Sequence, residues 1–213
     1  HGANRLGGNS LSDLIVLGCR AGRGAADYAS GLSGSPRADD DQVVAAFRRA
    51  TQPLHRDAGE NPYLLHDQLQ QIMDAKVGIV RHAAELQQGI DQLAELGRRV
   101  EQVKAVGSSQ YNPGWHEALA MRSLIVVAEA VALSAMTREE SRGAHTRLDF
   151  DGERDEWLRF NVVVRRADDG RMQVERVARP EPPAELARIA YAKIEDLERE
   201  IAAEATAAPR AGR

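Results

Sequence analysis

The sequence has few aromatic residues and no excess of positive charge, and each shortage excludes a class of function. Aromatic side chains make up 4% of the 213 residues, which argues against the stacking platforms that bind single-stranded nucleic acid. The formal net charge is −4, so no bulk basic field points to nucleic acid or to an anionic membrane surface. Nucleic acid is therefore not expected as a partner.

Cysteine and metal-binding motifs are equally scarce. The single cysteine, Cys19, cannot form an internal disulfide, and its place in an apolar helical pattern predicts a small buried side chain. There is neither a CxxC pair nor an HExxH motif, and His66, His82 and His116 lack the spacing of metal ligands, so no metal is expected. The longest uncharged apolar runs, such as residues 124–127, are far shorter than the roughly 20 residues of a membrane-spanning helix.

Apolar residues recur at steps of three and four through the middle of the chain. This spacing predicts helices over about residues 41–54, 62–80, 86–103 and 115–139. Long amphipathic helices with short polar connections bury their apolar stripes against one another. The fold class is therefore predicted to be mainly α, with an antiparallel helical bundle over residues 40–142.

The pattern changes at both ends of this bundle. Ser10 is a candidate N-cap for a helix over about residues 11–29, and the Gly/Ser/Pro-rich stretch that follows predicts a domain boundary. This loop and helix form a first domain over residues 1–32. Residues 157–166 and 172–178 are rich in β-branched residues around the turn sequence ADDG, which predicts a β-hairpin. With a last helix over about residues 184–205, the hairpin forms a C-terminal α+β tail over residues 143–213.

The first ten residues, HGANRLGGNS, have the composition of a binding site. Arg5 offers a planar fork that matches a carboxylate or a phosphate. Gly7 and Gly8 allow a ligand to approach the backbone closely, and Ser10 and Leu11 place free amide groups at a helix N-terminus. A glycine-rich turn that only caps a helix has the same pattern, so these residues alone favour the two interpretations about equally.

The longer stretch HGANRLGGNSLSDLIVLGCRAG closely resembles the C-terminal FAD-contact segment of the succinate dehydrogenase/fumarate reductase flavoprotein family. A second stretch, MTREESRGAH followed by TRLDF at residues 136–150, is similar to the other C-terminal signature of that family. The two stretches occur in the family's order, with a helical bundle between them. The resemblance covers roughly residues 1–165 and implies a C-terminal portion, with the GxGxxG-containing nucleotide-binding domain expected upstream.

The resemblance implies a FAD-dependent enzyme that interconverts succinate and fumarate. By position in the motif, Arg5 matches the arginine that binds a substrate carboxylate, and Asn9, Ser10 and Leu11 match the flavin contacts. The expected partners are a dicarboxylate substrate, an iron-sulfur subunit and, indirectly, membrane anchor subunits. The expected location is cytoplasmic and peripheral, on the inner face of the plasma membrane. The isolated chain is expected to be inactive, because most cofactor contacts of the family lie upstream.

Two alternatives remain open from the sequence. L-aspartate oxidase shares both signatures and the same bundle, although the form HGANRLGGNSL with GAH after ESR favours the respiratory enzyme. A helical interaction module without activity of its own is the alternative from a different class. Within the second signature, Glu140 and Arg142 are expected to form a polar clamp between the bundle and the flavin domain. His145 is expected to hydrogen-bond a turn or a carboxylate rather than to act in catalysis.

Overall fold

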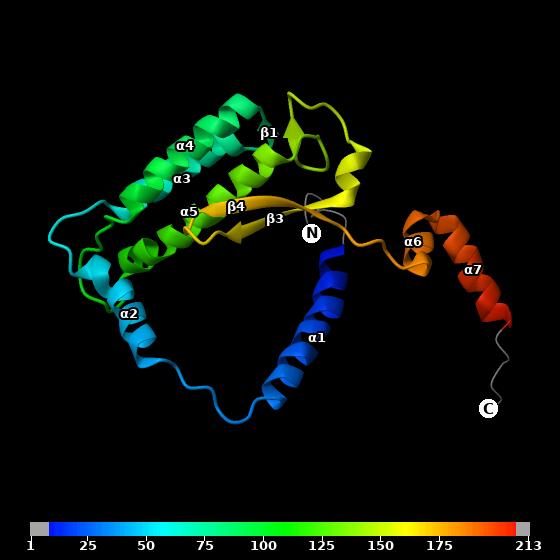
Figure 1. The fold of residues 1–213 in the computed structure, drawn as a ribbon, viewed down its shortest axis with the longest axis horizontal. Helices are drawn as coiled ribbons and strands as arrows, with labels where there is room; N and C mark the ends of the chain where they lie inside the picture. Colours follow the sequence, from blue (N-terminus) through cyan, green and yellow to red (C-terminus); the bar gives the residue numbers. More distant parts are fainter. Residues whose placement is uncertain (1–8, 208–213) are drawn as a thin grey trace. The chain divides into compact units, whose positions relative to one another are not determined.

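The computed structural model describes the backbone of residues 9–207 and the side chains of residues 11–203 (Figure 1). The chain divides after Val177 into two compact units. The first unit contains α1 (Asn9–Ser30), α2 (Asp40–Thr51), the helical bundle and a β-hairpin, and the second contains two short helices. The mainly α fold predicted from the sequence is confirmed.

The bundle consists of α3 (Pro62–Val77), α4 (Ala83–Val100) and α5 (Pro113–Thr137), each of which begins at a side-chain cap. Asn61 accepts a hydrogen bond from the Tyr63 amide, and Asn112 accepts one from the Trp115 amide. Both asparagines precede a proline at the first helical position, where the missing N–H costs nothing. These Asn-Pro pairs explain why both helices begin close to the predicted positions.

The core lies where the three helices meet, and it is built from aliphatic side chains at the predicted three- and four-residue steps. Leu65, Leu86 and Met121 have no exposed surface, and burial of each such side chain stabilises the fold by about 1.5–3 kcal/mol. Gly89 allows α3 and α4 to approach closely, because a Cβ there would lie 3.0 Å from the Lys76 Cβ and 3.1 Å from Val77 Cγ2.

Helix α5 corrects one expectation from the sequence. Its 25 residues include a window with a mean hydropathy of 1.8, so by length and composition alone it could cross a membrane, whereas the short apolar runs predicted no such helix. The small residues between those runs supply the missing apolar length. Ala118, Ile125, Ala128 and Ala132 on one face are buried against the bundle, as in the core helix of a globular domain.

The helix predicted over residues 41–54 has two parts. Helix α2 begins at an Asp39 cap and ends at Thr51, and a 3-10 turn, η1 (Gln52–Leu54), completes it. The indole nitrogen of Trp115 donates to the Ala50 carbonyl at 2.7 Å. This bond joins the end of α2 to the first turn of α5.

A short parallel ladder closes one end of the bundle. Strands β1 (Val80–Arg81) and β2 (Thr146–Arg147) pair there, and β2 carries the buried Arg147, of which 2% is exposed. The Arg147 Nη1 atom donates to the carbonyl oxygens of Ala135, Met136 and Arg138, at 2.9, 3.1 and 3.2 Å. These carbonyls lie at the C-terminal end of α5, where a cation offsets the partial negative charge of the helix.

The other side of the Arg147 guanidinium forms a bidentate pair with Asp149, with both N–O distances at 2.8 Å. The second carboxylate oxygen of Asp149 also accepts a hydrogen bond from the Ala83 amide, 3.1 Å away at the N-terminus of α4. The bond to Arg147 holds the pKa of the Asp149 carboxyl well below its ordinary range. We call the Arg147–Asp149 pair the helix clamp, because it joins the end of α5 to the start of α4.

The predicted hairpin is present as β3 (Phe160–Arg166) and β4 (Met172–Ala178), with Gly170 in the left-handed region at φ 81°. Its first strand begins later than predicted, because a 3-10 helix, η2 (Asp155–Arg159), contains Trp157 and buries it. The start predicted at residue 157 was therefore wrong.

In the second unit, the single helix predicted over residues 184–205 is interrupted. It is replaced by α6 (Ala184–Tyr191) and α7 (Ile194–Ala207), with Ala192 in an extended conformation. Arg188 Nη1 lies 2.8 Å from the Glu200 carboxylate. Twelve residues of one continuous helix would separate the two by about 18 Å, so this ion pair exists only because the helix breaks.

We expect Arg147→Met to lower the free energy of unfolding by about 3–5 kcal/mol, because it leaves Asp149 and the α5 carbonyls without their buried donor. Arg98→Met is the matched control: the Arg98 side chain is 69% exposed, and we expect a change below about 0.5 kcal/mol. Urea unfolding followed by circular dichroism measures both. Equal stability of the two variants would show that the helix clamp does not hold the bundle.

Candidate functional site

Of the four site residues predicted from the first signature, the structure describes three, namely Asn9, Ser10 and Leu11. Arg5 lies outside the described residues. Asn9 and Ser10 already belong to α1, so the prediction that Ser10 is an N-cap before the helix was wrong. Several neighbouring polar residues can cap a helix, which is why a sequence places such a boundary only within one or two positions. Ser10 and Leu11 still lie in the first turn, whose amides have no acceptor inside the helix.

Helix α1 exposes a continuous apolar surface. The exposed fractions of Leu11, Leu14 and Ile15 are 72%, 67% and 69%, and more than half of Val16 and Leu17 is exposed as well. Cys19 is also exposed, which contradicts the prediction of a buried side chain. The sequence indicated correctly that this helix has apolar faces, but within the described chain these faces are not covered.

The second signature forms a buried polar cluster beside the helix clamp, centred on Glu140. The side chain of Glu140 has no exposed surface and accepts hydrogen bonds from Arg142 at 3.1 Å, from the Arg154 amide at 2.9 Å and from Arg138. Burial alone would raise the pKa of this carboxyl, but the bonds from Arg142, Arg154 and Arg138 together lower it below its ordinary value. Glu140 is therefore a charged structural centre and not a proton donor.

His145 lies in the same cluster with both ring nitrogens occupied. Arg81 can only donate, so Nδ1 of His145 accepts from the Arg81 guanidinium and Nε2 donates to the Arg138 carbonyl at 3.1 Å. Burial lowers the pKa of His145, and the nearby guanidinium groups of Arg81, Arg147 and Arg138 lower it further. The imidazole is neutral near pH 7. The expectation that His145 hydrogen-bonds a turn is confirmed.

Several members of this cluster were not identified from the sequence. Arg147 and Asp149 belong to the stretch TRLDF, but Arg147 lies ten residues beyond the end of α5, so no local pattern indicates that it caps that helix. Trp157 is buried with 3% exposed, and the guanidinium carbons of Arg138 and Arg176 lie 5.1 and 4.2 Å from its ring centroid. This arrangement brings together residues far apart in the chain, which no local pattern indicates.

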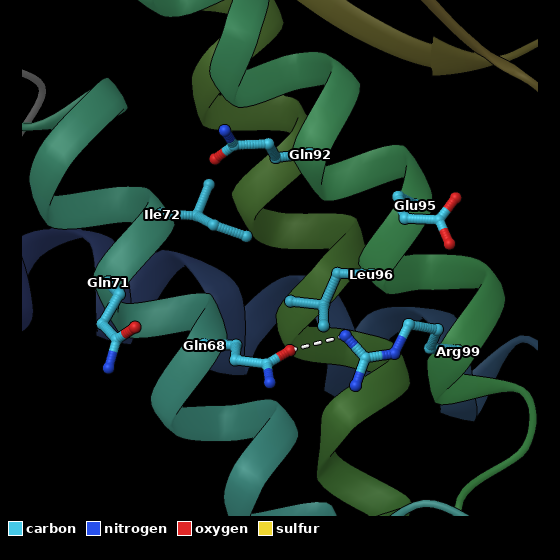
Figure 2. A pocket seen from close by; sticks show the side chains of 7 residues that line it. All are labelled: Gln68, Gln71, Ile72, Gln92, Glu95, Leu96 and Arg99. Atoms are coloured by element: carbon cyan, nitrogen blue, oxygen red, sulfur yellow. Dashed lines mark hydrogen bonds between the residues drawn. The ribbon is translucent and has the colours of Figure 1, made fainter.

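A shallow pocket of about 330 Å³ lies between α3 and α4, and its lining includes Gln68, Gln71, Gln92 and Arg99. Figure 2 shows Gln68 pointing toward Arg99 across this pocket. The Arg99 guanidinium donates to Gln68 at 2.7 Å and to Glu60 at 2.8 Å. Its hydrogen-bonding capacity is thus used in holding the helices together. Over the described part of the chain, no group of three or more His, Cys, Asp and Glu side chains could hold a metal ion.

We expect the stability of the Glu140 cluster to depend on pH. A carboxyl whose pKa is lowered by folding stabilises the native state above its unfolded pKa of about 4.3, and this contribution is lost as the pH falls below that value. Glu140→Gln should lower the free energy of unfolding at pH 7 by about 1–3 kcal/mol and flatten its decline below pH 4.3. Urea titrations at several pH values measure this. Glu139→Gln, at an exposed neighbour, should leave the slope unchanged, and an unchanged slope in Glu140→Gln would contradict the role given to Glu140.

Comparison with known proteins shows which family the chain is similar to. A family described as fumarate reductase flavoprotein C-term matches residues 66–201. The succinate dehydrogenase flavoprotein subunit of Coxiella burnetii is 36% identical over 168 residues, which cover 78% of this chain and 28% of the relative. The fumarate reductase flavoprotein subunit of Escherichia coli is 38% identical over 174 residues, covering 79% and 29%. The chain thus spans less than a third of the length of these relatives.

Among solved structures, the Mycobacterium smegmatis Sdh1 complex in its apo form contains a chain that is 41% identical, with a TM-score of 0.83. The match covers 93% of the present chain and 34% of that one. The chain belongs to the fumarate reductase flavoprotein C-terminal family, the C-terminal portion of the succinate dehydrogenase/fumarate reductase flavoprotein subunits.

Proposed function

We propose that this chain is the C-terminal part of a FAD-dependent flavoprotein subunit that interconverts succinate and fumarate and passes electrons to an iron-sulfur subunit. The observation that carries the proposal is the match to solved and curated members of the family over most of the chain, at up to 41% identity. The names of these relatives favour the respiratory enzyme over L-aspartate oxidase.

In this chemistry, helix α1 would contact the flavin and the segment before it would bind the substrate. When bound, FAD supplies the hydride acceptor or donor. The first-turn amides of Ser10 and Leu11 would lie against its electron-rich pyrimidine side, which suits the positive end of α1. Arg5 would bind one carboxylate of the dicarboxylate and orient its carbon atoms, because a small misplacement of reacting atoms costs rate steeply.

The apolar surface of α1 supports the same proposal. Leu14, Ile15 and Leu17 are each more than half exposed within the chain, which suits a helix that packs in the nucleotide-binding part of a complete subunit. We infer that Glu140 and Arg142 hold the second signature in shape for its contact with that part. Membrane anchor subunits would bring the complex to the inner face of the plasma membrane, where the flavoprotein is peripheral.

We expect Arg5→Ala in the complete flavoprotein to lower the rate of succinate oxidation at least about a hundredfold, because the substrate loses its orienting charge-assisted pair. The flavin content should stay normal, since the contacts assigned to the flavin are backbone amides. Arg23→Ala, which removes an exposed charge on the same helix, is the matched control and should keep its activity. Near-normal turnover in Arg5→Ala would refute the assignment of Arg5.

The purified 213-residue chain should be colourless and inactive, because two first-turn amides and their neighbours are too few contacts to hold a dinucleotide. The visible absorbance of the chain, before and after incubation with excess FAD and gel filtration, measures this. Retention of stoichiometric yellow flavin would contradict the division of the cofactor site that we propose.

A further inference from the structure

A second hollow, larger than the pocket of Figure 2, lies between the bundle and the hairpin of the first unit. It has a volume of about 890 Å³ and is lined by α4, α5, the β3–β4 hairpin and the last turn of α2. Its apolar lining includes Leu93 on α4, Ile125 and Val126 on α5, and Met172 on β4. Val126 is 55% exposed, so this floor is open to a binding partner.

The charged lining of this hollow is dominated by arginine. Five arginines contribute to it: Arg49, Arg122, Arg165, Arg166 and Arg171. Together with the apolar floor they define what we call the arginine groove. They outnumber the two carboxylates of the lining, which belong to Glu101 and Glu129.

Ion pairs within the protein neutralise only part of this charge. Arg122 pairs with Glu101 at 2.6 Å, which leaves a positive excess in the groove. Arg165 and Arg171 form solvent-exposed pairs with carboxylates outside the groove, and pairs of this kind hold a side chain weakly. In the part of the chain that the structure describes, neither Arg49 nor Arg166 has a carboxylate partner.

The groove has the length of a short peptide segment. It extends over eight residue steps from Leu93 on α4 to Glu101, the residue that follows α4, and over eight steps from Arg122 to Ala130 on α5, or about 12 Å along each helix. Ala94, Gly97 and Ala130 line it without long side chains and keep the floor open. A small inorganic anion would not cover the apolar floor of the groove, and a cation would be repelled by its arginines. Neither ligand therefore matches the whole lining.

We propose that the arginine groove docks an acidic amphipathic segment of a partner polypeptide. The apolar side chains of that segment would cover Val126 and Met172, and its carboxylates would pair with Arg49 and Arg166. Such segments bind by laying apolar residues at helical spacing into a groove, while complementary charge sets the orientation and speeds association. The proposal rests on this groove and does not depend on the flavin chemistry proposed above.

The test uses the purified 213-residue chain and a fluorescent helical peptide of about four turns, with leucine at positions i, i+3, i+4 and i+7 and glutamate elsewhere. Fluorescence anisotropy should show saturable binding that weakens as salt is added. Three control peptides replace all glutamates by glutamine, all glutamates by lysine, or all leucines by serine, and each should bind about tenfold more weakly or not at all.

Variants of the chain locate the binding. Val126→Glu places a carboxylate in the floor of the groove and should weaken binding of the acidic peptide about tenfold or more. Val127→Glu is the matched control, because Val127 is the next residue of α5, is 60% exposed and does not line the groove. Arg49→Gln with Arg166→Gln should weaken binding and reduce its salt dependence. Circular dichroism and urea unfolding establish that each variant retains the parent fold.

Four outcomes would overturn the proposal. The first is the absence of saturable binding of the acidic peptide, and the second is equal binding by the Val126→Glu and Val127→Glu variants. The third is binding of phosphatidylserine vesicles or inorganic phosphate, without the peptide, in a way that Val126→Glu abolishes. The fourth is concentration-dependent self-association in analytical ultracentrifugation that Val126→Glu removes, which would make a second copy of the chain the occupant.

Discussion

The bundle depends on one buried guanidinium. Arg147 donates hydrogen bonds to three carbonyl oxygens at the end of α5. Its partner Asp149 accepts a hydrogen bond from an amide at the start of α4, so one ion pair satisfies backbone groups of two helices. Neither helix end could be buried without such partners, because unpaired backbone groups away from water are costly. The β1–β2 ladder and the Glu140 cluster form around this centre. The main structural role of the second signature is therefore to close one end of the bundle.

The helices could be predicted because their information is local. The stripes of α3, α4 and α5 repeat at the helical period, and Asn61-Pro62 marks a start that the structure confirms. Their packing into a bundle follows from the same stripes, since each has only its neighbours to bury against. Resemblance to the flavoprotein family added what periodicity could not, namely which chemistry the first ten residues would serve.

The remaining features depend on contacts between distant residues. The β-branched pattern that begins at Trp157 predicts a strand there. In the structure Trp157 lies in a 3-10 helix, with its ring between Arg138 and Arg176. The break at Ala192 occurs among residues that all favour a helix, and the ion pair from Arg188 to Glu200 accompanies it. Cys19 follows a pattern that indicates burial, but no part of the described chain covers it. In each case the local sequence pattern predicts one conformation or degree of burial. The contacts that the residue makes with distant parts of the described chain, or lacks there, determine the one observed.

Every buried residue of the described chain lies between Pro53 and Trp157, whereas the segment assigned to substrate and flavin lies in the first eleven residues. The stretch that folds the bundle and the stretch to which we assign the chemistry are thus separate parts of one polypeptide. A lineage could alter the proposed substrate-facing stretch without destabilising the bundle, and could change its buried residues without altering that stretch. This separation would let one bundle accompany electron donors and acceptors of different kinds during evolution.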